Sequence, residues 1–254
     1  MDLHLRGKRV LITGASKGIG AAAAEAFAEE GCHLRLAARS GDALKALAER
    51  LRSQHQIDAT SHVVDLRKAD DIQKLVKDAS DIDILINNAG DIPGGSIDKI
   101  DEPTWRHAWE LKVFGYINLT RLVHADMKSR NHGVIVNIIG AAGERFNYDY
   151  ITGSAGNAAL MAFIKSLGGR SLHYGVRVVG INPGPVETDR HIYLMKTRAR
   201  NELGDENRYG DLMKDFPLGR AARPREIADM TVFLASDRSA YTSGVIVTID
   251  GVRQ

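Results

Sequence analysis

Cysteine is almost absent from this chain: Cys32 is the only one among 254 residues. A single cysteine excludes an intramolecular disulfide and fits a reducing compartment. No apolar run approaches the length of a membrane span, and residues 1–8 contain no apolar core of a signal peptide. We therefore expect a cytoplasmic protein without a membrane partner.

An excess of charge of one sign is also lacking, because 34 Lys and Arg residues are balanced by 32 Asp and Glu residues. A formal net charge of +2 does not indicate a nucleic-acid partner. The sequence has no metal-ligand spacing of His, Cys, Asp and Glu, and no Gly-x-Ser-x-Gly elbow of a hydrolase. We expect a small-molecule substrate, with neither metal nor nucleic acid.

What the sequence does contain is a regular alternation of short apolar runs with longer amphipathic stretches. The runs are residues 9–13, 33–37, 59–64, 82–86, 134–139, 176–181 and 245–249, and the main amphipathic stretches are 41–54, 68–79, 102–129, 155–173 and 224–235. Such alternation predicts an α/β fold with a doubly wound parallel sheet of seven strands, a Rossmann fold with helices on both faces. The ligand crevice is expected at the carboxyl ends of the strands.

We expect one domain over residues 1–254, because chains of this length in α/β folds commonly do not divide. Residues 187–216 are charged and poor in strand signals. A loop this long inside a compact domain usually serves as a lid or a binding segment. We therefore predict a substrate lid there.

A glycine-rich turn follows the first apolar run. Thr13-Gly14-Ala15-Ser16-Lys17-Gly18-Ile19-Gly20 stands between Val10-Leu11-Ile12 and an alanine-rich stretch that begins at Ala21. Glycine permits positive φ and close approach of the backbone to a phosphate, whose charge is then stabilised by free N–H groups of the helix N-terminus. A strand, a glycine turn and a helix in this order predict a dinucleotide site.

The turn resembles the TGxxxGxG motif of the short-chain dehydrogenase/reductase family. Further segments resemble that family's motifs: Asn87-Asn88-Ala89-Gly90, Asn182-Pro183-Gly184 and the tail from Pro217 to Gly251. The resemblance implies that the cofactor is bound by Gly14, Ser16, Lys17, Gly18, Ile19, Gly20, Arg39, Asp65, Leu66, Asn88, Ala89, Gly90, Pro183, Gly184, Val186 and Thr188.

The second expected strand favours NADP(H) over NAD(H). The family's acidic position at the end of this strand corresponds to Ala38, and Arg39 follows. A guanidinium pairs well with a 2′-phosphate, and Lys17 resembles the second basic residue of NADP-preferring members. The alternative for Arg39 alone is an exposed charge at a strand end.

The resemblance also implies that the family's catalytic side chains are replaced. Val136-Asn137-Ile138-Ile139-Gly140 puts Gly140 at the serine of the family, and Asn157-Ala158-Ala159-Leu160 puts Asn157 at its lysine. Gly153 then stands at the tyrosine, and Lys112 at the asparagine. The lysine of that family lowers the pKa of the tyrosine, which exchanges a proton with the substrate.

Two interpretations of these replacements stay open. In the first, Lys112 and Asn157 have exchanged the lysine and the amide of the family, which keeps a positive charge near the ribose. In the second, the two replacements are unrelated sequence drift, and Lys112 extends into solvent. On a continuous helix, Tyr150, Gly153, Ser154 and Asn157 share one face. Tyr150 or Tyr148 could then fill the space at Gly153, or either tyrosine packs against the lid. The catalytic candidates are Tyr150, Lys112, Asn157 and Ser154.

Charged residues of the expected lid offer another hypothesis. Arg190, Lys196, Arg198 and Arg200 would present positive charge to an anionic substrate, although the acidic residues among them favour a solvated lid. We expect self-association as a homodimer or homotetramer through residues 102–129 and 155–173. The apolar side chains proposed for that contact are Trp109, Phe114, Leu119, Met161 and Phe163.

Three functions remain compatible with these residues. The first is an NADP(H)-dependent oxidoreductase that acts on a carbonyl, an alcohol or an activated double bond by a non-standard mechanism. The second is a non-redox enzyme on the same fold, and the third is a catalytically inactive NADP-binding regulatory or sensor protein. Oxidation of NADPH across a panel of carbonyl compounds would separate the first from the other two.

Overall fold

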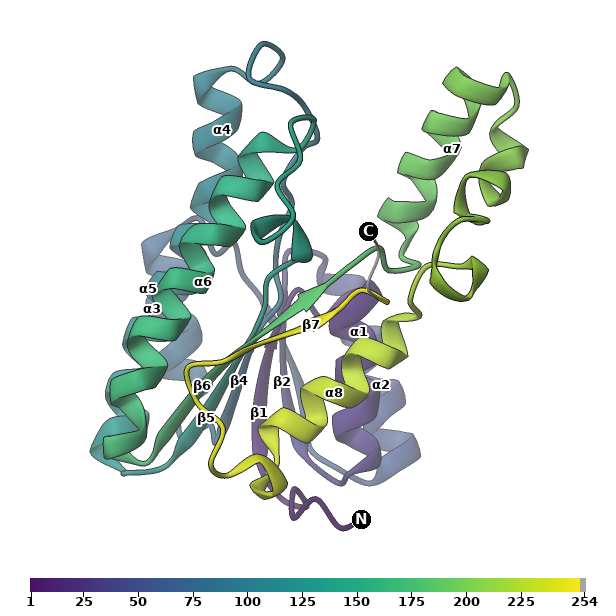
Figure 1. The fold of residues 1–254 in the computed structure, drawn as a ribbon. Helices are drawn as coiled ribbons and strands as arrows, with labels where there is room; N and C mark the ends of the chain where they lie inside the picture. Colours follow the sequence, from purple (N-terminus) through teal and green to yellow (C-terminus); the bar gives the residue numbers. More distant parts are fainter. Residues whose placement is uncertain (252–254) are drawn as a thin grey trace.

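The computed structural model describes residues 1–251 and contains one parallel sheet of seven strands in the order β3-β2-β1-β4-β5-β6-β7 (Figure 1). The strands are β1 (Arg9–Thr13), β2 (His33–Ala38), β3 (Ala59–Val63), β4 (Ile84–Asn87), β5 (Gly133–Ile138), β6 (Val176–Pro183) and β7 (Ile246–Ile249). The predicted fold class is confirmed. Observed ends differ from the expected ones by one or two residues; β6, for example, extends to Pro183, because that residue pairs with Ile249 of β7.

Helices cover both faces of the sheet. One face is covered by α1 (Gly18–Glu29), α2 (Gly41–His55) and α8 (Pro224–Ala235), and the other by α3 (Ala69–Asp78), α5 (Gly115–Ser129) and α6 (Ile151–Ser171). The strands are therefore buried on both sides: Val10 and Ile12 of β1 belong to the first core, whereas Leu11 belongs to the second.

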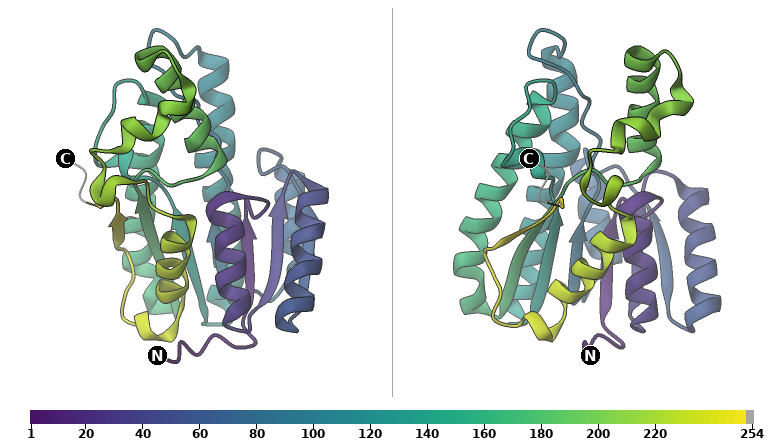
Figure 2. Two further views of the ribbon diagram at one scale, coloured as in Figure 1. Left: turned by 90° about the vertical axis from the view of Figure 1, so that its right-hand side faces the viewer. Right: turned by 45° about the vertical axis from the view of Figure 1, so that its right-hand side comes forward.

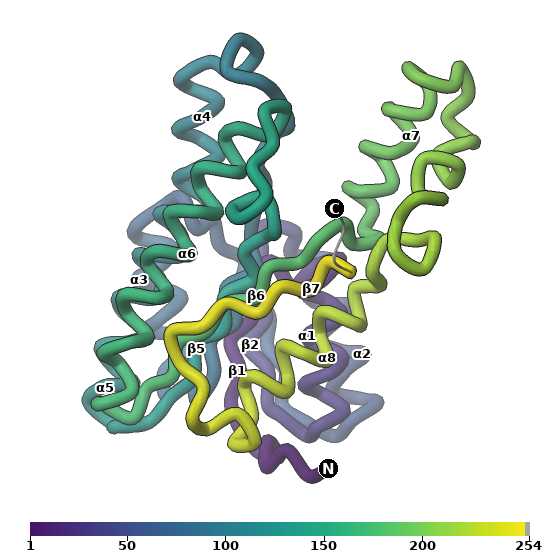
Figure 3. The backbone as a smooth tube through the Cα atoms, in the orientation of Figure 1, coloured from purple at the N-terminus to yellow at the C-terminus, as the bar shows by residue number. Residues whose placement is uncertain are grey.

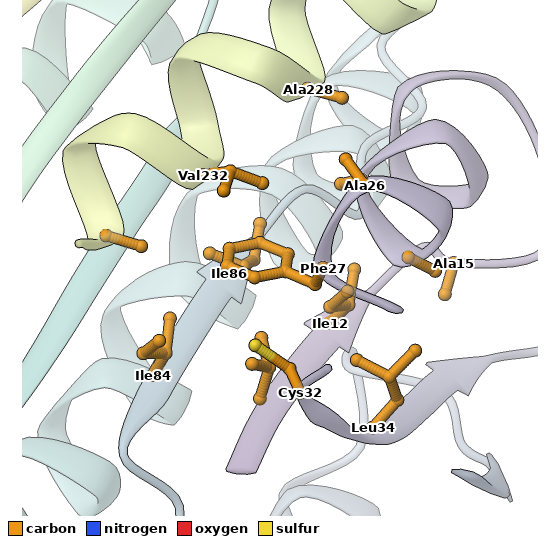
Figure 4. Packing of buried hydrophobic residues seen from close by; sticks show 14 of the residues in the cluster. Ile12, Ala15, Ala26, Phe27, Cys32, Leu34, Ile84, Ile86, Ala228 and Val232 are labelled. Carbon is orange, nitrogen blue, oxygen red and sulfur yellow. The ribbon is translucent and has the colours of Figure 1, made fainter. Parts of the chain in front are cut away.

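Figure 4 shows the first core from close by. Phe27 of α1 lies between Ile12 and Ile86 of the sheet and Val232 of α8, and it is fully buried. Complete burial of a phenylalanine in such a site contributes roughly 1.5–3 kcal/mol relative to exposure. Cys32 lies in the same core, where burial raises the pKa of its thiol to about 12 and keeps it unreactive.

The expected helix over residues 102–129 is interrupted. It consists of α4 (Glu102–Trp109), a π-helical turn η1 (Glu110–Phe114) and α5. The helix expected over 155–173 begins earlier, at Ile151, and ends in a 3₁₀ turn. Among residues 1–251, no helix is both long and apolar enough to cross a membrane.

Residues 187–216 are not the loop that the sequence analysis predicted. They form helix α7 (Asp189–Leu203) and the 3₁₀ segment η4 (Glu206–Met213), which pack on each other. This helical hairpin projects beyond the carboxyl edge of the sheet (Figures 2 and 3). Ile192, Met195, Ala199 and Leu203 form a short apolar stripe at helical spacing, but only Ala199 is fully buried. The sequence analysis considered only the lack of strand signals in this charged segment and missed the helix.

Candidate functional site

A cavity of about 1090 Å³ lies at the carboxyl ends of the strands. The chain changes direction between β1 and β4, because β2 and β3 lie on one side of β1 and β4–β7 on the other. At such a switch point the loops after neighbouring strands diverge and leave a crevice. The cavity is lined by the loops after β1, β2, β4, β5 and β6, together with the start of α7.

The glycine turn forms one wall of this cavity. Gly14 and Gly18 have φ values of +65° and +58°, which other residues rarely adopt. A Cβ atom on Gly20 would lie 2.3 Å from the carbonyl oxygen of Gly14, so this glycine allows α1 to approach β1 closely. Lys17 at the N-cap makes no side-chain capping bond to the first turn of α1. Free N–H groups therefore stand where a pyrophosphate would bind.

The loop after β4 is tied to this turn by hydrogen bonds. The backbone N–H groups of Asn88 and Ala89 donate to the Thr13 hydroxyl at 2.9 and 3.1 Å. The Asn88 side chain donates to the carbonyl oxygens of Thr13 and Gly14 at 3.0 and 3.2 Å. The predicted cofactor residues from the first and fourth strands are thus brought together at one edge of the sheet.

Arg39, Lys17 and Ala38 also line the cavity, beside the glycine turn. Arg39 and Lys17 are exposed, and no acidic residue lines the cavity between residues 14 and 66. Leu66 lines the cavity, whereas Asp65 does not. The Asp65 carboxylate instead pairs with Arg67 at 2.6 Å, and this hydrogen bond holds the pKa of the Asp65 carboxyl below its usual value.

The loop after β6 forms the adjoining part of the cavity wall. Pro183, Gly184, Val186 and Thr188 line the cavity, and the Thr188 hydroxyl accepts a hydrogen bond from the His191 N–H group at the start of α7. A Cβ atom on Gly18 would lie 3.2 Å from Cγ2 of Thr188. The segment that precedes α7 therefore packs directly on the glycine turn.

Tyr150 occupies the space above Gly153. The tyrosine is the N-cap of α6, with φ −139° and ψ 39°, so the helix begins after it and the condition of one continuous helix through Tyr150 is not met. A backbone bridge to Gly95 holds this segment in place. A Cβ atom on Gly153 would nevertheless lie only 2.0 Å from Cε1 and 2.2 Å from Cζ of the Tyr150 ring. The ring therefore fills the volume in which a side chain at residue 153 would begin, and Tyr150 lines the cavity.

Lys112 is buried in the cavity wall. Its ammonium donates to the carbonyl oxygen of Ile138 at 2.7 Å and to the hydroxyl of Tyr116 at 3.1 Å. Burial, assisted by the charge of Arg190, lowers the pKa of Lys112 from 10.5 to about 7. The alternative in which this lysine extends into solvent is wrong, because only 7% of the residue is exposed.

Asn157 lies beneath Gly140. Its amide nitrogen would be 2.8 Å from a Cβ atom on Gly140, whose φ of +146° itself disfavours any other residue. The residue is 3% exposed, and Oδ1 has no hydrogen-bond partner within the described chain. A buried acceptor without a partner costs free energy unless a ligand donates to it. Because Asn157 lines the cavity, such a ligand has access.

Ser154 does not reach the cavity. Its hydroxyl accepts from the N–H group of Asn147 at 3.1 Å and donates to the carbonyl oxygen of Asn147 at 3.4 Å. The side chain stabilises the turn before α6, which argues against the catalytic role considered above. Tyr148 does line the cavity, but its hydroxyl donates to Asp98 and its residue is 61% exposed.

Two arginines line the cavity, and each is held by contacts that no sequence motif predicted. The guanidinium of Arg145 pairs with the carboxylate of Asp250 at 2.8 Å. The guanidinium of Arg190 donates to the carbonyl oxygen of Ile92 and lies 3.4 Å from Asp91. The partners of each arginine are about a hundred residues away, so only the tertiary structure reveals them. Residues 1–251 contain no cluster of three His, Cys, Asp or Glu residues that could hold a metal ion.

This sheet order, together with a glycine turn at the switch point, defines a dinucleotide-binding α/β protein. Residues 8–199 match the family model described as short chain dehydrogenase. The chain belongs to this family of oxidoreductases.

Relatives cover nearly the whole chain. The 3-oxoacyl-[acyl-carrier-protein] reductase FabG of Chlamydia trachomatis is 30% identical, over 96% of each chain. The 2-keto-3-deoxy-L-fuconate dehydrogenase of Xanthomonas campestris is 34% identical over 98% of this chain and 81% of its own length. Among solved structures, L-sorbose reductase from Gluconobacter frateurii, complexed with NADPH and L-sorbose, superposes with a TM-score of 0.92 at 32% identity, over 99% of this chain and 98% of its own.

Proposed function

We propose that this protein is an NADP(H)-dependent oxidoreductase that interconverts a carbonyl and an alcohol on a small molecule. When bound, the nicotinamide supplies the hydride that adds to the carbonyl carbon. The relatives include reductases and dehydrogenases of carbonyl compounds, two of which act on sugars or sugar acids by name. A polyhydroxylated ketone is the substrate class that we would test first.

The proposed mechanism is non-standard because the four family positions hold Gly140, Gly153, Asn157 and Lys112. The observation that carries it is the Tyr150 ring, which fills the space above Gly153 from three residues earlier. Burial raises the pKa of Tyr150, so its phenol stays protonated at neutral pH. In reduction, Tyr150 donates this proton to the substrate oxygen while the carbonyl carbon accepts the hydride.

Lys112 and Asn157 support the same site as an exchanged pair. The unpartnered Oδ1 of Asn157 accepts a hydroxyl, either of the ribose or of the substrate. Lys112 contributes a cation whose pKa of about 7 allows it to exchange a proton near neutral pH. Gly140 offers no side chain to polarise the carbonyl, so Asn157 beneath it is the nearest amide for that task.

The test is NADPH oxidation with a panel of ketoses and other ketones. Tyr150→Phe should lower kcat by ~10²–10⁴-fold, the usual contribution of general acid catalysis, while NADPH affinity is kept. Tyr148→Phe is the matched comparison. A larger loss in that variant would assign the proton donor to Tyr148 instead. Tight NADPH binding without turnover of any panel member would favour the non-redox enzyme or the sensor.

The cofactor preference is a separate prediction. Arg39 and Lys17 are expected to pair with the 2′-phosphate, whereas Ala38 offers the ribose hydroxyls of NAD(H) no acceptor. NADPH should therefore bind at least ~10-fold tighter than NADH, which corresponds to ~1.4 kcal/mol. Arg39→Asp should reverse the order in a fluorescence titration, and Lys45→Asp, an exposed change on α2, should not. Equal affinity of the wild type for both cofactors would contradict this assignment.

A further inference from the structure

Two charged residues of α7 line the cavity, Asp189 and Arg190, and Arg190 is the basic one. It follows Thr188, the N-cap of α7, by two residues, and its guanidinium contacts Asp91 and Ile92 in the loop after β4. Burial lowers the pKa of Lys112, and the charge of Arg190 adds to that effect. Burial raises the pKa of Tyr150, and the charge of Arg190 partly opposes that effect. Arg190, Lys112 and Tyr150 line the same cavity, so the guanidinium shares it with the two groups that we place beside the substrate carbonyl.

The charge of Arg190 is only loosely compensated. Its hydrogen bond to Ile92 ends on a neutral carbonyl oxygen, and its single carboxylate partner in the described chain, Asp91, is 3.4 Å away with 66% of its side chain exposed. Arg145 differs, because its partner Asp250 lies at 2.8 Å with 6% of its side chain exposed. An exposed pair of this kind contributes little to stability, so a substrate anion displaces Asp91 at little cost.

We infer that Arg190 binds a carboxylate adjacent to the reacting carbonyl, so that the preferred substrate is a 2-oxo acid or the corresponding 2-hydroxy acid. This inference rests on the proposed function for the position of the carbonyl. A carboxylate is planar and accepts two parallel N–H bonds from a guanidinium, which would fix the neighbouring carbonyl relative to Tyr150. Reduction then converts the ketone to the hydroxyl, with one hydride from the nicotinamide and one proton from Tyr150.

The probes are L-sorbose and 2-keto-L-gulonate, which share one skeleton and differ at C1, where the second compound has a carboxylate. Binding to the cofactor-free protein is measured by calorimetry, and KM and kcat are measured with NADPH. We expect the acid to bind at least ~10-fold tighter than the sugar, and Arg190→Gln to remove this difference. Arg198→Gln removes a charge from the same helix outside the cavity and should preserve it.

Asp91→Asn separates this role from a purely structural one. If Asp91 competes with the substrate anion, its neutral variant binds the acid more tightly and the sugar unchanged. If Arg190 only fastens α7 to the loop after β4, then Arg190→Gln and Asp91→Asn weaken both probes equally, and the inference fails. It also fails if the acid does not bind at millimolar concentration. Binding of the acid through Arg190 without NADPH oxidation would retain the inference and refute the proposed function.

Discussion

At the scale of single residues, Lys112 is notable because its charged ammonium group is buried without a carboxylate partner in the described chain. The residue is 7% exposed, and of the three donors of its ammonium two are bonded to Ile138 and Tyr116. The described neighbours include no carboxylate paired with it, and Arg190 adds repulsion. A residue of this kind is retained at a cost in stability, which is typical of functional sites.

Lys112 should therefore make stability depend on pH. Its pKa in the folded protein, about 7, lies below its ordinary value of 10.5, so the unfolded chain binds more protons between these limits. Its effect on stability consequently becomes less favourable as pH falls from 10.5 toward 7. Lys112→Met should raise the free energy of unfolding near pH 6 by a few kcal/mol, at ~1.4 kcal/mol per pKa unit.

Denaturant titration at pH 6 and pH 10 checks this prediction. The gain should shrink at pH 10, which serves as an internal control for packing changes. The substitution leaves the Tyr116 hydroxyl bonded to Ile138 at 2.9 Å, so no carbonyl loses its last partner. An equal gain or loss at both pH values would show that Lys112 is not desolvated as described.

At the scale of elements, local deviations from regular helix determine the site. The π-helical turn η1 contains Lys112, and such turns within helices are frequent at functional sites, because the extra residue redirects side chains. The N-cap of α6 places Tyr150 over Gly153, although the two residues are not on a continuous helix. Neither deviation can be recognised from the helical spacing of apolar residues, and the sequence analysis expected one unbroken helix over residues 102–129.

At the end of α8, by contrast, a buried charged side chain has only a structural role. Arg177 of β6 donates to the carbonyl oxygens of Leu234, Ala235 and Ser236 at 2.6, 3.1 and 2.9 Å. These are carbonyls at the C-terminus of the helix, where a cation is favourable. Burial alone therefore does not identify a functional residue; access to the cavity, which Lys112 has and Arg177 lacks, makes the difference.

At the scale of the whole molecule, the proposed contact between copies depends on which apolar side chains are exposed. Leu119 and Met161 were proposed for a contact between copies, but they are 0% and 6% exposed and belong to the core. Phe114 is 44% exposed, and Trp109 and Phe163 are partly buried, so these three remain available. The proposal of a homodimer or homotetramer through α4, α5 and α6 now depends on them.

Light scattering at micromolar concentration should give a dimer or a tetramer. Phe114→Glu should shift the protein toward a smaller species, because a carboxylate would be buried in an apolar contact. Tyr193→Glu changes another exposed aromatic residue, on the projecting hairpin, and should leave the assembly intact. A monomeric wild type, or dissociation caused by both changes, would refute the proposed surface.

The sequence by itself determined the sheet, the glycine turn and the carboxyl edge of the sheet at which the cavity lies. These features rest on short-range patterns: apolar runs buried on both faces, glycines at positions of positive φ, and motifs that follow individual strands. Each of these features can be recognised in the sequence because the residues that form its pattern lie within a few positions of one another. Residues 187–216 show the limit, since the apolar stripe of α7 is short, lies among charged residues and is only partly buried, so it was overlooked.

Only the tertiary structure decided how the candidate catalytic groups meet. Their contacts depend on the relative placement of α6, η1, α7 and the loops after β4 and β5. These contacts are Tyr150 with Gly153, Asn157 with Gly140, Lys112 with Ile138 and Arg190 with Ile92. That placement follows from packing of the entire core and has no local signature. The physical reason is that a side chain's pKa and its hydrogen-bond partners depend on the residues packed around it. Many of those residues are distant in the sequence, so a local pattern does not identify them.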